Sequence, residues 1–101
     1  MPRALATVGD QIVAETETWE SVEGNIYFPP SALTDPKLFE HSDLSTFCSW
    51  KGYASYYTVT VDGKTLENAA WYYKEPYGKA LNIKDYIAFY KDKVEIVKSR
   101  Y

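Results

Sequence analysis

The chain has very little cysteine and histidine, the residues that form disulfides or bind metal ions in many small proteins. Cys48 is the only cysteine and His41 the only histidine among its 101 residues. A single cysteine excludes a disulfide within the chain and a zinc site built from several thiolates. A single histidine excludes a metal site rich in imidazole ligands. We therefore expect no bound metal and no cofactor.

The chain also lacks an excess of basic residues and any long apolar run. Its 11 basic and 14 acidic side chains give a net charge of −3, which argues against a nucleic-acid binder. No apolar run approaches the ~20 residues that span a bilayer. The segment Met1-Pro2-Arg3 leads into no stretch typical of a signal peptide. We predict a cytoplasmic protein that binds neither nucleic acid nor membrane.

Aromatic residues are abundant instead. They make up 17% of the chain, with ten tyrosines, four phenylalanines and three tryptophans. Each large ring buries ~150–250 Å², so these rings help a short chain to form a core without disulfides. Because 101 residues is a typical size for one domain, we expect residues 1–101 to form a single domain.

Short runs of strand-forming residues alternate with turn signals. The pattern predicts strands over residues 5–8, 11–15, 18–22, 25–28, 37–43, 53–61, 64–73, 86–90 and 94–98. Helical turns are expected over 31–33 and 78–84, and the last two strands are expected to pair as a hairpin. Residues 83–90 also fit a helix, but their β-branched and aromatic side chains favour a strand. The predicted fold is all-β, mainly antiparallel hairpins, in a compact sandwich, tent-like or barrel-like arrangement.

The central hairpin carries the strongest turn signal, Asp62-Gly63, because a type I′ turn needs positive φ at both residues. A two-residue loop places Val61 opposite Lys64, and Tyr57 opposite Asn68. One face of this hairpin then carries small residues beside large rings with polar tips: Ala54, Tyr56, Ala69, Trp71 and Tyr73. Such a face is typical of a small-molecule pocket. The alternative is that the N-terminal strands simply cover this face.

Several ordered segments carry a family resemblance. They are Tyr27-Phe28-Pro29, Cys48-Ser49-Trp50-Lys51-Gly52, Asn68-Ala69-Ala70-Trp71 and Tyr86-Ile87-Ala88-Phe89-Tyr90. Over about residues 5–97, the chain resembles the uncharacterised family called domain of unknown function 427. The resemblance implies a compact, mostly β domain and supplies no mechanism. One departure is Ser49, where the family commonly has proline. A nucleotidyl-transfer label is sometimes given to the family, but this chain has no phosphate-cradling glycine loop.

Cys48 is the one possible thiolate nucleophile, and Lys51 or His41 could take its proton. The alternative is a buried thiol that packs as a small hydrophobe. Lys51 could hold a carboxylate or phosphate as a point charge, or could be an ordinary solvated lysine. Asn68 interrupts an apolar strand, so a buried amide there must find partners, either in a neighbouring loop or in a ligand.

We expect the chain to bind a small polar or anionic ligand in an aromatic pocket. The candidate ligand-binding residues are Trp50, Lys51, Tyr56, Asn68, Trp71 and Tyr73. Two alternatives stay open at this stage. One is an enzyme that uses Cys48 as its nucleophile. The other is an interaction module or homodimer that uses exposed tyrosines, since aromatic residues are favoured at interfaces.

Overall fold

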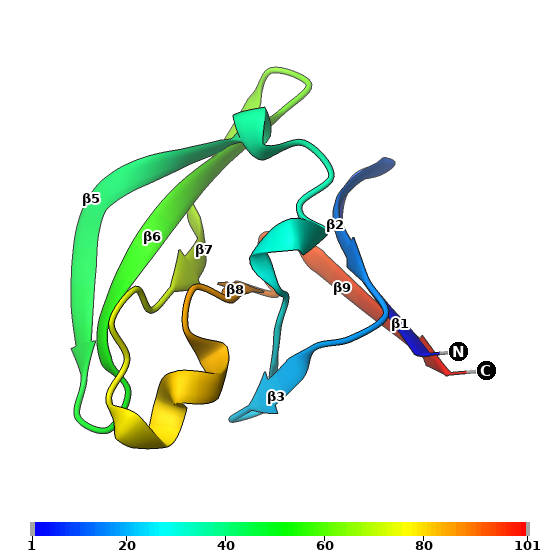
Figure 1. Cartoon of the computed structure of the whole chain (residues 1–101). Helices are drawn as coiled ribbons and strands as arrows, with labels where there is room; N and C mark the ends of the chain where they lie inside the picture. Colours follow the sequence, from blue (N-terminus) through cyan, green and yellow to red (C-terminus); the bar gives the residue numbers. More distant parts are fainter. Residues whose placement is uncertain (1, 101) are drawn as a thin grey trace.

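The computed structural model describes residues 2–100, and it places nine strands in three antiparallel sheets (Figure 1). The predicted all-β fold is confirmed. The first sheet has the order β2–β1–β9, with strands Gln11–Thr16, Pro2–Val8 and Glu95–Arg100. The second is the hairpin of β3 (Glu20–Val22) and β4 (Asn25–Tyr27). The third has the order β5–β6–β7–β8, with strands Phe39–Cys48, Gly52–Val61, Lys64–Tyr72 and Ile87–Phe89.

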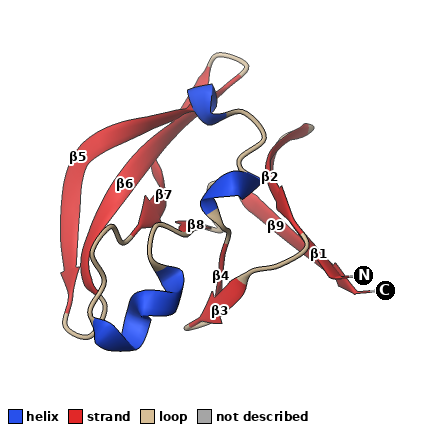
Figure 2. Cartoon of the chain, viewed as in Figure 1, coloured by secondary structure: helices blue, strands red, loops and turns tan. Residues whose placement is uncertain are grey.

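Three short 3-10 helices connect these strands (Figure 2). They are η1 (Pro30–Ala32), η2 (Pro36–Leu38) and η3 (Gly78–Ile83). Proline opens η1 and η2, since its fixed φ suits the first position of a helix. The helical turns predicted near residues 31–33 and 78–84 are therefore confirmed. None of the helices among residues 2–100 has the length and apolarity needed to cross a membrane.

Turn chemistry explains the local hairpins. Glu23 and Gly24 join β3 to β4, and Asp62 and Gly63 join β6 to β7. All four residues have positive φ, between 51° and 79°, as a type I′ turn requires. The turn predicted at Asp62-Gly63 is confirmed, and so is the pairing of Val61 with Lys64.

The prediction that the last two strands form a hairpin is wrong. Strand β8 pairs with β7, whereas β9 pairs with β1 and brings the two ends of the described chain side by side (Figure 1). The reason lies in the connecting loop. The backbone N–H groups of Lys93 and Val94 both donate to the carbonyl of Tyr90, at 3.0 and 2.9 Å. This helical-type turn redirects the chain away from β8.

The predicted register of the central hairpin holds at the turn and fails beyond it. Tyr57 pairs with Ala70 and not with Asn68, because the register shifts between Tyr57 and Val59. Asn68 lies in this bulge with a φ of 51°. The shift amounts to two residues, so side chains on either side of the bulge keep their predicted faces. At the bulge itself the prediction is wrong, because Ala69 lies in the same apolar cluster as Ala70, and Asn68 lies beside Tyr56.

Two apolar clusters therefore lie on opposite faces of the β5–β8 sheet. The first packs against the β1–β2–β9 sheet and includes Phe28, Val59 and Phe89. The second contains four residues of the face predicted from the sequence, Ala54, Tyr56, Trp71 and Tyr73, together with Tyr27, Ala80, Ile83 and Ala88. Ala69, predicted on this face, lies in the first cluster instead. Tyr27 of β4 and the buried residues of η3 cover this second face. The cover decides which candidate side chains reach solvent.

Candidate functional site

Trp71 lies at the centre of the second cluster. Its indole N–H donates to the Tyr27 hydroxyl at 3.1 Å, and the two rings meet edge to face with centroids 6.2 Å apart. The Tyr90 ring also lies beside it, with the two ring centroids 4.7 Å apart. Trp71 thus separates two groups of polar side chains, one around Lys51 and one around Asn68.

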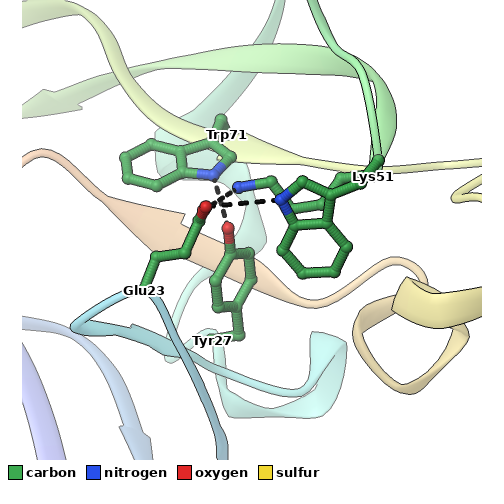
Figure 3. Close-up of polar contacts among 5 residues, drawn as sticks. Glu23, Tyr27, Lys51 and Trp71 are labelled. Atoms are coloured by element: carbon green, nitrogen blue, oxygen red, sulfur yellow. Dashed lines mark hydrogen bonds and ion pairs between the residues drawn. The ribbon is translucent and has the colours of Figure 1, made fainter.

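The first group surrounds the Lys51 amine. Lys51 lies in the turn between β5 and β6, and its Nζ forms an ion pair with Glu23 of the β3–β4 turn (Figure 3). The amine also lies 5.5 Å from the ring centroid of Trp50 and 5.4 Å from that of Tyr73. The Trp50 indole N–H donates to the second oxygen of the same carboxylate at 3.4 Å. Both Glu23 oxygens thus have a donor.

Burial differs sharply across this ion pair. The Lys51 side chain is 8% exposed, whereas that of Glu23 is 50% exposed. Burial opposes the charged amine, but the hydrogen bond to Glu23, with Tyr27 and Tyr73 nearby, raises the pKa of Lys51 above its ordinary value. The same hydrogen bond lowers the pKa of Glu23. The pair is therefore fully ionised at neutral pH.

This ion pair predicts a pH dependence of stability. The pKa of Glu23 is lower in the folded chain than its ordinary value of 4.5. The Glu23 carboxylate therefore contributes fully to the free energy of unfolding above pH 4.5, and this contribution is lost as the pH falls through the folded pKa. We expect the urea midpoint of wild type to exceed that of Glu23→Gln at about pH 6, and the difference to vanish in acid. A difference that is constant from neutral to acidic pH would contradict this assignment.

The second group lines a cleft of about 300 Å³. Its lining, called the Asn68 cleft below, consists of Leu44, Tyr56, Asn68, Tyr90, Asp92 and Lys93. The rings of Tyr56 and Tyr90 are stacked, with 5° between their planes and hydroxyl oxygens 3.4 Å apart. The Tyr56 hydroxyl also lies 2.8 Å from the Thr46 hydroxyl.

Asn68 is the most unusual member of this lining. Its backbone N–H donates to the Thr58 hydroxyl at 3.2 Å, which fixes the bulge. Its side-chain oxygen Oδ1 is buried and has no hydrogen-bond partner within the described chain. Buried polar atoms are normally paired, since an unpaired one costs about 1–3 kcal/mol. This oxygen therefore carries an unmet hydrogen bond in a residue of the cleft lining.

The Tyr90 hydroxyl is neutral. Burial, followed by the hydrogen bond between its hydroxyl and that of Tyr56, raises the pKa of Tyr90 to about 12. At physiological pH its hydroxyl therefore keeps its proton and can both donate and accept. The charges at the rim come from Asp92 and Lys93, which are of opposite sign. Lys93 is held in place, because its amine donates to the Glu67 carbonyl at 2.8 Å.

Comparison with known proteins identifies the family. The sequence profile described as "Domain of unknown function (DUF427)" matches residues 3–100. The chain belongs to this family. The resemblance seen in the sequence is thereby confirmed. No curated protein matches the chain.

In this DUF427 chain the six predicted ligand-binding residues fall into two places. Trp50, Lys51 and Tyr73 lie together at the ion pair, whereas Tyr56 and Asn68 line the cleft. Trp71 lies between the two. Sequence reasoning missed Glu23 and Tyr90, each of which completes one of these places. Glu23 could have been noticed from its turn. Glu23-Gly24 is a typical hairpin turn, and such a turn exposes its first side chain at the hairpin tip.

Cys48, the candidate nucleophile, ends β5 and is half-buried against the second cluster. Within residues 2–100, no base is hydrogen-bonded to its thiol. His41 is engaged elsewhere, with its Nδ1 2.9 Å from the Tyr72 hydroxyl, and the Lys51 amine is paired with Glu23. In the same described part, no three His, Cys, Asp or Glu side chains are grouped to hold a metal ion. Catalysis by Cys48 stays a hypothesis.

Proposed function

We propose that this chain binds a small polar molecule in the Asn68 cleft. The observation that carries the proposal is the buried Asn68 oxygen without a partner. When the Asn68 side chain turns this oxygen into the cleft, a ligand N–H or O–H group would satisfy it and recover the free energy that the unpaired oxygen costs. The cleft volume of about 300 Å³ lies at the lower end of the range for ligand pockets, about 300–1,000 Å³. This volume suits a molecule of the size of a monosaccharide or a nucleobase.

The lining favours a ligand without net charge. Asp92 and Lys93 bring one negative and one positive charge to the rim, so an anion or a cation would meet a like charge as well as an opposite one. The hydroxyls of Tyr56 and Tyr90 provide further hydrogen-bonding groups, and Leu44 provides an apolar wall. An uncharged or zwitterionic molecule with a flat or apolar face suits these groups best.

Backbone strain supports the same conclusion. Asn68 holds a φ of 51°, a region that non-glycine residues seldom occupy and that asparagine tolerates better than most. Such residues cluster at ligand sites, where the surrounding structure maintains the strain. Here the bulge turns the asparagine side chain out of the strand alternation, beside the cleft-lining Tyr90 and Lys93.

A thermal-shift screen tests the proposal. The panel contains neutral sugars, nucleosides, nucleobases, amino acids and polyols. A compound present at 100-fold excess over its dissociation constant adds about 2.7 kcal/mol to the free energy of unfolding, which is readily visible as a higher melting temperature. We expect at least one of these classes to raise it. A flat response across the whole panel, up to the solubility limits, would count against ligand binding in this cleft.

A further inference from the structure

A separate carboxylate-binding arrangement lies on the far side of Trp71 from the Asn68 cleft. The Glu23 carboxylate is bound through both oxygens by neighbouring residues of one turn (Figure 3). The Lys51 amine binds Oε1, and the Trp50 indole N–H binds Oε2. A carboxylate group fits this pair of donors, because each donor binds one of its two oxygens. The positive charge on the Lys51 amine strengthens the binding.

The donor side of this arrangement is fixed. The Lys51 stem is buried, and its amine lies over the ring faces of Trp50 and Tyr73. The Lys51 carbonyl accepts a hydrogen bond from the Tyr77 backbone at 3.0 Å. Gly52 follows with a φ of 108°, and a side chain there would lie 3.4 Å from the Glu75 carbonyl. The turn that presents both donors is therefore well defined.

The acceptor side is peripheral. Glu23 sits at the tip of a hairpin with three-residue strands, and half of its side chain is exposed. The hairpin does not depend on this contact alone. The Lys91 amine donates to the Gly24 carbonyl at 2.8 Å, and the Asn82 amide donates to the Glu20 carboxylate at 2.8 Å. The Glu23 side chain can therefore rotate into solvent while the hairpin stays attached.

We propose that Trp50 and Lys51 form a binding site for the carboxylate of a small organic acid, and that Glu23 occupies this site until such a ligand replaces it. The exchange is one carboxylate for another, so the buried amine is never left without a counter-charge. A tethered group acts at an effective concentration of roughly millimolar. The tethered Glu23 therefore excludes weak carboxylates and admits a ligand that makes additional contacts.

The test uses acetate as the probe and Glu23→Gly as the variant, because glycine suits the positive φ at this position. The readout is the Trp50 indole N–H resonance in two-dimensional NMR spectra, with acetamide as the neutral probe at constant ionic strength. We expect acetate to shift this resonance in Glu23→Gly at a concentration on the order of tenfold below that needed in wild type. Acetamide should have no effect.

The matched control is Glu23→Gly combined with Lys51→Met, which keeps the buried stem and removes the charge. It should abolish the response to acetate. An equal response to acetate and acetamide, or no response to acetate in Glu23→Gly, would overturn the proposal. If Glu23→Gly does not fold, Glu23→Gln carries the same test, because its neutral amide competes weakly for the amine. None of these results bears on the Asn68 cleft, whose lining shares no residue with this site.

Discussion

Replacing Trp71 with alanine is expected to destabilise the chain by about 3–5 kcal/mol, the usual range for truncating a buried aromatic residue. Trp71 is 9% exposed and lies in the centre of the second cluster. Its loss removes the edge-to-face contact with Tyr27 and the contact with Tyr90. It also leaves the buried Tyr27 hydroxyl without its hydrogen-bond donor. The total free energy of unfolding of a native protein is only about 5–15 kcal/mol, so this loss is a large share of it.

Urea denaturation measures this effect, with Trp71→Phe as the control. Phenylalanine keeps most of the buried ring surface but lacks the indole N–H, so it should destabilise distinctly less than alanine. Trp50→Ala is a second control, because it also removes an indole. Since Trp50 is 38% exposed, this replacement should lower the free energy of unfolding only slightly. A loss below about 1 kcal/mol for Trp71→Ala would show that the two polar groups are not separated by a packed ring.

Replacing Asn68 with glycine is expected to separate binding from stability. Glycine retains the positive φ of the bulge and removes the unpaired buried oxygen. Removing that oxygen relieves a penalty of about 1–3 kcal/mol, which offsets the ~0.5–1 kcal/mol that glycine loses in chain entropy. The melting temperature without ligand should therefore stay the same or rise. Ligand affinity should fall by at least about tenfold, since a hydrogen bond to the ligand is lost.

Asn82→Gly is the control for this variant, because it removes an exposed amide from η3, outside the cleft lining. It should leave ligand affinity unchanged. If Asn68→Gly instead lowers the melting temperature strongly while a ligand from the thermal-shift screen still binds with wild-type affinity, the Asn68 side chain supports the bulge and does not bind the ligand.

Local turn chemistry explains why much of the fold could be predicted. Asp62-Gly63 defines its hairpin by itself, since few residues accept positive φ at consecutive positions. The two faces of that hairpin were also predictable outside the bulge, because side chains alternate and the bulge shifts the register by an even number. Within the bulge, Asn68 and Ala69 lie on the faces opposite to those predicted. The bulge itself was not predictable, because it depends on a bond between the Asn68 backbone and Thr58. The pairing of β9 with β1 likewise depends on contacts between the two ends of the described chain.

The candidate residues follow from residue types in the sequence, whereas their arrangement does not. Their residue types, which combine a polar tip with an apolar body or place an amide in an apolar strand, are enough to indicate Tyr56, Lys51 and Asn68. Their separation into two places follows from Tyr27 and Trp71, which fill the space between them with a buried hydrogen-bonded pair. The partner of Lys51 is 28 residues away in the sequence, and no periodic pattern links two turns at that distance. Only the packing of the β3–β4 hairpin beside the sheet brings them together.

The most direct measurement is a titration of ¹⁵N-labelled protein with the strongest compound from the thermal-shift screen, followed in two-dimensional NMR spectra. We predict that the largest shifts fall on the Asn68 side-chain amide and on the backbone signals of the cleft lining: Leu44, Tyr56, Tyr90, Asp92 and Lys93. Saturable shifts confined to another surface, such as the β1–β2–β9 sheet, with the Asn68 amide unmoved, would contradict binding in the cleft.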